Sequence, residues 1–210
     1  MTPANLPIAL SHWEAITQRA LAEMRLASLQ ALWAPRLRKI GQAIFNQLAK
    51  DSATRQVEAV EQQHILPGQP DITARFDRLD TTPQGKVVVD YKTGGIPSWT
   101  DLRQGWEPQL LLEGALLAAQ GQKVSDLEFW QLKVKAGGLD VHSYADKFDD
   151  LPEQLTLAQK KLNDIKAQFA SPNAQYPAVP AGPSTLKLEA PCKTCPYQGV
   201  CRLHEWYGEA

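Results

Sequence analysis

The segment from Ile72 to Lys92 constrains the fold of this chain more than any other part of it. Apolar and polar residues alternate from Ile72 to Asp77, which is the period of a half-buried strand. A second strand is predicted from Lys86 to Lys92, around three consecutive valines. The Thr-Thr-Pro-Gln-Gly sequence between the two segments is typical of a turn. We therefore expect a β-hairpin, and the chain must build a sheet around it.

This hairpin is predicted to bring three charged side chains to one face. If the turn centres between Pro83 and Gln84, Asp77 lies opposite Asp90, and directly opposed residues project to the same face. Lys92 shares that face with Asp90 because alternate residues of a strand point the same way. The sequence thus predicts that Asp77, Asp90 and Lys92 lie together.

Such a group of side chains has a specific chemistry. Two carboxylates held close together repel each other and raise the pKa of one of them unless a positive charge is near. A divalent cation supplies that charge, and oxygen ligands favour Mg²⁺ or Mn²⁺. The cation can activate water, and a lysine can neutralise charge that develops during phosphodiester hydrolysis. The spacing alone leaves an alternative, in which Asp77, Asp90 and Lys92 form a surface ion-pair ladder with Arg78.

The remaining segments indicate an α/β protein. Leucine and isoleucine recur at helical spacing in the first fifty residues, and Pro35 predicts either two helices or a kink there. Further elements are expected as helices over 109–120 and 149–169 and strands over 127–134 and 139–144. We divide the chain into an N-terminal helical region (1–50), a core (51–170) and an extended segment with a cysteine-containing C-terminal part (171–210).

Composition excludes several classes of protein. The 210 residues carry 22 lysines and arginines against 23 acidic residues, which excludes a strongly basic nucleic-acid coat but not a nuclease with a local basic surface. The sequence shows no apolar run long enough to cross a membrane, no secretory signal and no nucleotide-binding phosphate loop. We therefore expect a cytoplasmic protein with no membrane contact and no helicase motor of its own.

All three cysteines of the chain lie close together near its C-terminus. Cys192, Cys195 and Cys201 have the spacing C-x2-C-x5-C, which is typical of a metal-ligand cluster. His204 could complete a zinc site with them. Buried thiols without a metal are the remaining alternative.

Three blocks in order resemble one family. Residues 74–80 (ARFDRLD), 88–94 (VVDYKTG) and 108–112 (PQLLL) are similar to the RecB-like branch of the PD-(D/E)xK nucleases, in particular to AddB-type nuclease domains of bacterial DNA double-strand-break repair. The resemblance implies a restriction-endonuclease-like core, a mixed sheet flanked by helices, with a cysteine-bearing C-terminal extension. It also implies Mg²⁺-dependent (or Mn²⁺-dependent) hydrolysis of DNA, without sequence specificity, alongside a helicase or nuclease partner subunit.

The resemblance also implies roles for individual residues. Asp77 and Asp90 would bind the metal, with the Tyr91 carbonyl as a further ligand, and Lys92 would be the catalytic lysine. Gln109 would match the family glutamine that lies over the active site. The cysteine tail would hold a [4Fe–4S] cluster if a fourth cysteine were supplied upstream.

The chain departs from the family pattern at three places. Glu113 stands where the family usually has a tyrosine, four residues after the glutamine. Phe45 occupies the place of a metal-binding histidine on an upstream helix, and the fourth cysteine is absent. Two interpretations follow: the chain is the C-terminal portion of a longer nuclease, or it is a catalytically silent DNA-binding or scaffolding module within a larger repair complex.

Overall fold

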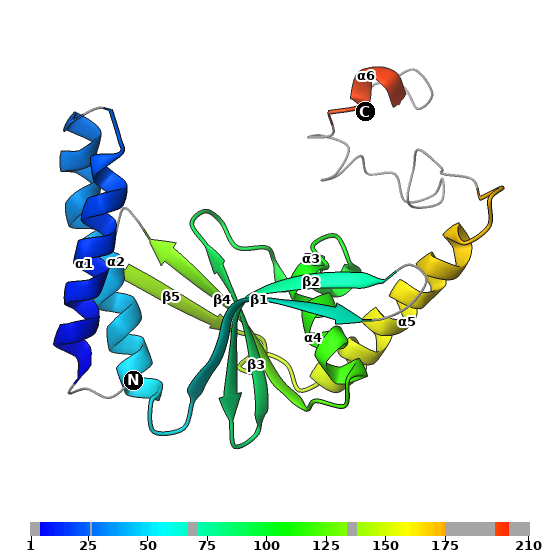
Figure 1. Ribbon diagram of the computed structural model, residues 1–210. Helices are drawn as coiled ribbons and strands as arrows, with labels where there is room; N and C mark the ends of the chain where they lie inside the picture. The colour runs from blue at the N-terminus through cyan, green and yellow to red at the C-terminus, as the bar shows by residue number, and fades with distance from the viewer. Residues whose placement is uncertain (1–4, 26, 67–70, 134–137, 175–195, 202–210) are drawn as a thin grey trace.

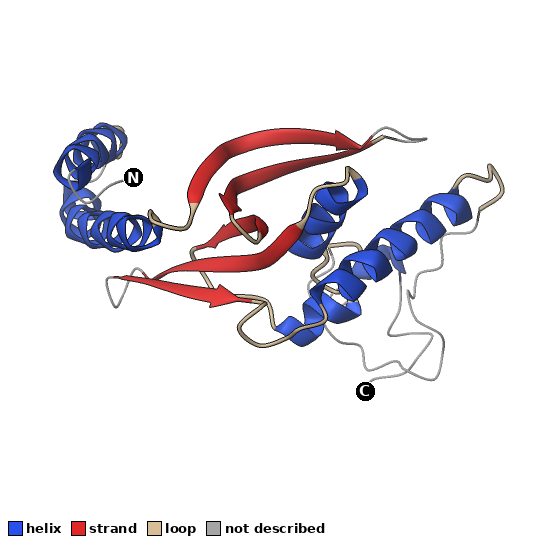
Figure 2. Ribbon diagram, turned by 90° about the horizontal axis from the view of Figure 1, so that it is seen from below, coloured by secondary structure: helices blue, strands red, loops and turns tan. Residues whose placement is uncertain are grey.

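The protein is built on one five-stranded sheet that carries helices on both of its faces (Figures 1 and 2). A computed structural model describes residues 5–25, 27–66, 71–133, 138–174 and 196–201. Its elements, in chain order, are α1 (Leu6–Ala22), α2 (Ala27–Asp51), β1 (Gln56–Leu66), β2 (Ile72–Thr82), β3 (Gly85–Lys92), α3 (Trp99–Gln104), α4 (Gln109–Ala119), β4 (Val124–Lys133), β5 (Gly138–Ser143), α5 (Leu151–Phe169) and α6 (Gln198–Cys201). The predicted α/β class with a mixed sheet is confirmed. Within the described ranges, no helix has the length and apolar character needed to cross a membrane.

The sheet contains one parallel pair among antiparallel ones. Its strand order is β1-β2-β3-β4-β5, with β3 and β4 parallel and the other three pairs antiparallel. Parallel neighbours need a crossover connection, and α3 and α4 provide it here. The crossover brings the start of α4, which follows α3 in the chain, next to the end of β3 and the residues that the sequence singled out.

The β2–β3 hairpin has the predicted register. Arg78 pairs with Val89 and Thr81 pairs with Lys86, so the turn lies where the sequence placed it. The ladder between β2 and β3 ends at the Arg78–Val89 pair, whereas β3 stays paired with β4 as far as Lys92. Beyond this point β2 remains paired with β1, and the two strands continue as a ribbon (Figure 1). The last residues of β3 therefore have a strand neighbour on one side only.

The N-terminal region forms two helices, but they do not divide at Pro35. The proline lies inside α2, exposed, and the break falls after α1 instead. A proline inside a helix removes one backbone hydrogen bond and crowds the carbonyl four residues earlier, and packing elsewhere along α2 can offset this cost. Trp13 of α1 donates a hydrogen bond of 2.9 Å from its indole nitrogen to the Leu37 carbonyl. A Cβ at Gly41 would lie 2.4 Å from the same indole nitrogen, so only glycine allows this close approach of the two helices.

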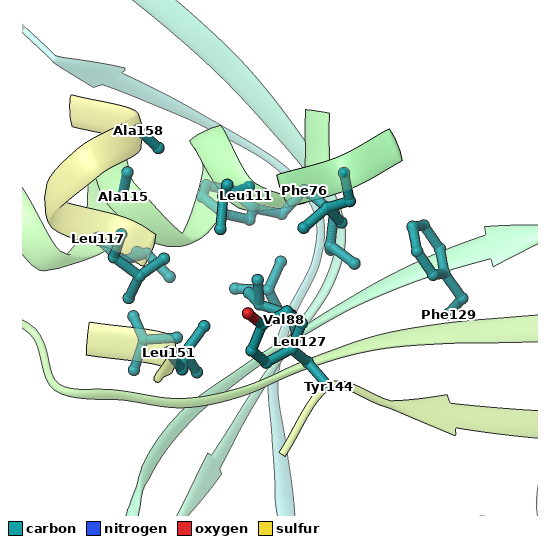
Figure 3. Close-up of a cluster of buried hydrophobic side chains, with 14 of the residues drawn as sticks. Phe76, Val88, Leu111, Ala115, Leu117, Leu127, Phe129, Tyr144, Leu151 and Ala158 are labelled. Carbon is teal, nitrogen blue, oxygen red and sulfur yellow. The ribbon is translucent and has the colours of Figure 1, made fainter. Parts of the chain in front are cut away.

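Each face of the sheet has its own apolar cluster. On one face, Val87, Val89 and Trp130 pack against side chains of α2. On the other face, a larger cluster joins the sheet to α4 and α5. Figure 3 shows its labelled members: Phe76, Val88, Leu111, Ala115, Leu117, Leu127, Phe129, Tyr144, Leu151 and Ala158.

One glycine lets α4 lie close to the sheet. A Cβ at Gly114 would come within 2.9 Å of a Leu127 methyl and within 2.8 Å of a Leu155 methyl. A larger residue here would require the leucine methyl groups to move, so glycine allows the close packing of α4 against β4 and α5 that the structure shows. The start of α4 lies at the end of β3, where Gln109 hydrogen-bonds to Asp90.

Candidate active site

The two aspartates of the hairpin are joined through the backbone of Tyr91. The Asp77 carboxylate accepts a hydrogen bond of 2.9 Å from the Tyr91 N–H. Because the β2–β3 ladder has already ended at Arg78, this side chain holds the end of β3 on the side where backbone pairing with β2 no longer does. Asp90 directly precedes Tyr91, so both carboxylates lie beside one peptide unit.

Lys92 forms an ion pair with Asp90. Its ammonium nitrogen lies 2.9 Å from Asp90 Oδ2 and 3.2 Å from Oδ1. The Asp90 side chain is 4% exposed, whereas that of Lys92 is 29% exposed. The structure therefore brings together Asp77, Asp90 and Lys92, as the alternation of the strands predicts. The buried position of Asp90 argues against a solvated surface ladder.

Gln109 reaches this group from the first turn of α4. Its amide nitrogen Nε2 donates to Asp90 Oδ1 over 3.2 Å and to Glu113 Oε1 over 3.1 Å. Gln109 is exposed, but Glu113, one helical turn later, is 4% exposed. The site thus contains a third carboxyl group, that of Glu113, which is linked to Asp90 through the Gln109 amide.

The electrostatics of the site reflect this crowding of carboxyl groups. Burial raises the pKa of Asp90, the charge of Asp77 adds to the effect, and the hydrogen bond and charge of Lys92 oppose it. Burial also raises the pKa of Glu113, to about 7, with Asp90 and Asp77 again contributing in the same direction. A site that raises carboxyl pKa values in this way favours the binding of a positive charge.

The carboxyl groups suit a particular kind of metal ion. Asp77 and Asp90 offer oxygen ligands, and Mg²⁺ is commonly bound through one or two carboxylates together with several waters. Within the described residues, no group of three or more His, Cys, Asp or Glu side chains is placed to hold a metal. The donors therefore fit a hydrated Mg²⁺ or Mn²⁺ better than a cation enclosed by protein ligands.

The opposite face of the sheet fixes the side chain of Tyr91. Its hydroxyl accepts a hydrogen bond of 2.7 Å from Arg78 Nη1, and the Arg78 guanidinium lies 3.9 Å from the centre of the Trp130 ring. Residues next to each other in a strand point to opposite faces. The anchor of Tyr91 on one face therefore supports Asp90 and Lys92 on the other.

A buried ion network extends this support. Arg55 donates to both carboxylate oxygens of Glu128, over 2.7 and 2.9 Å, and its Nε donates to Asp80 over 2.5 Å. Arg78 also pairs with Asp80, and the Trp130 indole donates to Glu128 over 2.7 Å. The network spans β2 and β4 and the residue just before β1. It links the strands beneath the site.

The cysteine cluster lies largely outside the described residues. Cys192, Cys195 and His204 are not among them, and Cys201 ends α6 without a described side chain. The choice between an iron–sulfur cluster, zinc and free thiols therefore stays a prediction from the sequence.

The fold and the acidic group beside a lysine define a nuclease-type domain. The family model of the PD-(D/E)XK nuclease superfamily matches residues 4–202. This chain belongs to the PD-(D/E)XK nuclease superfamily, and its sheet with flanking helices is consistent with the restriction-endonuclease-like fold of that superfamily. The search of curated proteins found no match.

Glu113 is the residue of this group to which sequence reasoning gave no role. It is the only charged residue of α4 and stands four positions after Gln109, a spacing that puts both side chains on one face of a helix. The spacing of Gln109 and Glu113 was visible in the sequence. It indicates a functional role for Glu113 only when α4 is known to be buried, which the sequence alone does not show.

Proposed function

We propose that this protein is a metal-dependent deoxyribonuclease in which Asp77 and Asp90 hold Mg²⁺ or Mn²⁺. The observation that supports this most is the Asp77–Tyr91–Asp90 arrangement, with Lys92 on Asp90, in a chain of the PD-(D/E)XK superfamily. The Tyr91 carbonyl is a further candidate ligand. A divalent cation, when bound, supplies an activated water and charge compensation at the phosphate.

The protein's own side chains have distinct tasks in this proposal. Lys92 is the more exposed residue of the Asp90–Lys92 pair. Its ammonium group can therefore reach a phosphate or the attacking water and still lie near the Asp90 carboxylate. Gln109 is exposed at the start of α4 and hydrogen-bonds to Asp90, so it can contact whatever enters the site. In this proposal Lys92 and Gln109 orient the substrate or the attacking water, and the two aspartates provide the negative charge that binds the cation.

The proposed substrate and cellular role are more specific than membership of the superfamily by itself implies. We propose DNA as the substrate, bound through its backbone without sequence specificity, within a recombination or repair helicase–nuclease system that includes a partner subunit. The support is the resemblance of the three sequence blocks to RecB-like and AddB-type domains. In the same proposal the three cysteines hold the C-terminal segment with a [4Fe–4S] cluster or, with His204, zinc, which metal analysis of the purified protein would distinguish.

The decisive experiment is digestion of end-labelled single- and double-stranded DNA. The wild-type chain is expected to cleave with Mg²⁺ or Mn²⁺ and to stop when EDTA is added, and Asp90→Asn is expected to be inactive. Cleavage that persists in Asp90→Asn would contradict the proposed site.

One observation favours a second candidate, a silent DNA-binding module of the same fold. Phe45, which stands at the place of the family's metal-binding histidine, packs its ring 6.1 Å from that of Trp13 in the α1–α2 pair. Its helix contacts the sheet face opposite to Asp90, so α2 brings no ligand to the site. Under this alternative the wild-type chain binds DNA but neither cleaves it nor binds Mn²⁺.

A further inference from the structure

Glu113 is a buried acid whose recorded hydrogen-bond partner is neutral. It is 4% exposed and lies on the face of α4 that packs against the sheet. A buried carboxyl group is costly unless its polar atoms are hydrogen-bonded. Its partner is the Gln109 amide, 3.1 Å from Oε1, rather than an arginine or a lysine. A leucine would bury the same helix face at a lower cost in free energy, so packing alone does not explain a carboxyl group at this position.

The hydrogen bonds of Gln109 supply that reason. An amide nitrogen has two hydrogens, and those of Gln109 are directed to Asp90 Oδ1 and Glu113 Oε1. The opposite orientation would place the amide oxygen against two carboxyl oxygens. The pair of acceptors therefore fixes which way the amide points, and the Gln109 carbonyl oxygen remains available to another donor.

We propose that Glu113 is a positioning residue of this site, which holds the Gln109 amide against Asp90 and so presents the Gln109 carbonyl oxygen to a water or nucleotide bound there. The inference rests on the proposed nuclease function. Gln109 is exposed and its side chain has three rotatable bonds, so one contact with Asp90 leaves it more freedom than two. Since Gln109 and Glu113 are one helical turn apart, α4 itself sets their spacing.

The charges around Glu113 agree with this role. Asp90 and Asp77 face it from the sheet and raise its pKa, while Lys92 acts in the opposite sense. Burial is the largest cause of the raised pKa. The hydrogen bond from Gln109 opposes this rise in pKa, because it stabilises the ionised carboxylate as an acceptor.

The test compares two substitutions that differ in one property. Glu113→Gln keeps the volume and an acceptor oxygen, whereas Glu113→Leu removes the acceptor. Glu153→Gln, on the exposed side of α5, is the matched control. Turnover on a short DNA duplex with Mn²⁺ is expected to fall about 10- to 100-fold in Glu113→Leu, and to stay within about threefold of wild type in Glu113→Gln and in the control.

A second readout needs neither metal nor DNA. In solution NMR of the full chain, the side-chain amide signals of Gln109, assigned by their loss in Gln109→Ala, are expected to shift in Glu113→Leu and to remain in place in Glu153→Gln. Unchanged Gln109 signals in a folded Glu113→Leu protein would overturn the inference. So would Glu113→Gln and Glu113→Leu proteins that lose turnover equally while both keep the wild-type melting temperature.

The two failures can be told apart. A wild-type chain that neither cleaves DNA nor binds Mn²⁺ would overturn the proposed function and, with it, the role of Glu113 in that reaction. In that case the NMR comparison still decides whether Glu113 holds Gln109. A wild-type chain that cleaves DNA and a Glu113→Leu variant that cleaves equally well would overturn this inference alone.

Discussion

The Asp77 carboxylate accepts a hydrogen bond of 2.9 Å from the backbone N–H of Tyr91. This contact forms beyond the point where the β2–β3 ladder stops, and it holds one acidic side chain beside the peptide that joins Asp90 to Tyr91. A single side chain therefore does two things: it extends the sheet by one bond and brings a second carboxylate to Asp90. The geometry of the site depends on where the ladder ends.

Removal of either aspartate charge is expected to weaken cation binding at least tenfold. Asp77→Asn and Asp90→Asn keep the size of each side chain, and the asparagine at 77 can still accept from Tyr91. Calorimetric titration with Mn²⁺ is expected to show at least a tenfold loss of affinity in both variants, because only one carboxylate remains for the cation. Asp164→Asn, exposed on α5, serves as the control and should bind like wild type. Wild-type affinity in both site variants would contradict the proposal.

Substitution of Lys92 is expected to reduce DNA cleavage without reducing the affinity for the metal ion. Lys92→Gln removes the ammonium that lies 2.9 Å from Asp90 but leaves both carboxylates in place. DNA cleavage is expected to fall by roughly 10²-fold or more, since the group that stabilises developing charge is lost. Mn²⁺ affinity should hold or increase, because a competing cation has gone. Lys160→Gln on the exposed side of α5 should change neither measurement. A loss of Mn²⁺ binding in Lys92→Gln would assign the lysine a structural role instead.

The stability of the metal-free protein is expected to decrease as the pH rises. Glu113 has its pKa raised from 4.5 to about 7 by burial, so the folded chain keeps a proton that the unfolded chain releases. The resulting stabilisation is complete below about pH 4.5 and is lost as the pH passes through about 7. The loss is at most roughly 3 kcal/mol.

Urea titrations from pH 5 to pH 8.5 measure this dependence. Glu113→Gln should flatten it, because the substituted side chain has no proton to lose, whereas Glu153→Gln should retain the wild-type slope. An unchanged slope in Glu113→Gln would show that other groups cause the pH dependence.

The buried network behind the site is expected to contribute strongly to stability. Glu128→Gln weakens the bidentate pair with Arg55, whose side chains are 11% and 7% exposed for Arg55 and Glu128 respectively. The substitution leaves Arg55 buried with Asp80 as its remaining counter-charge, and the expected loss in the free energy of unfolding is about 3 kcal/mol. The matched variant Glu14→Gln breaks an exposed pair with Arg38, whose side chains are 43% and 70% exposed, and should cost less than about 1 kcal/mol. Equal effects of the two variants in urea unfolding would contradict this account.

The hairpin and the residues it groups could be predicted from the sequence because their cause is local. Alternation along Ile72–Asp77 and the turn before Gly85 fix which residues of two neighbouring strands share a face. Asp77, Asp90 and Lys92 were therefore within reach of sequence reasoning. The family resemblance added Gln109, which the structure brings to Asp90.

Other features depended on contacts between distant segments. The N-terminal helices divide after α1 and not at Pro35, and Trp13 of α1 packs against Gly41 of α2, 28 residues further along the chain. The bidentate contact of Arg55 with Glu128 joins two residues that no local pattern relates. The sequence by itself determined the strand alternation, the register of the hairpin and the group of charges at its end. Only the tertiary structure decided that α4 would lie against that group and bury Glu113, because this depends on the packing of α4 against β4 and α5, which are distant in the sequence.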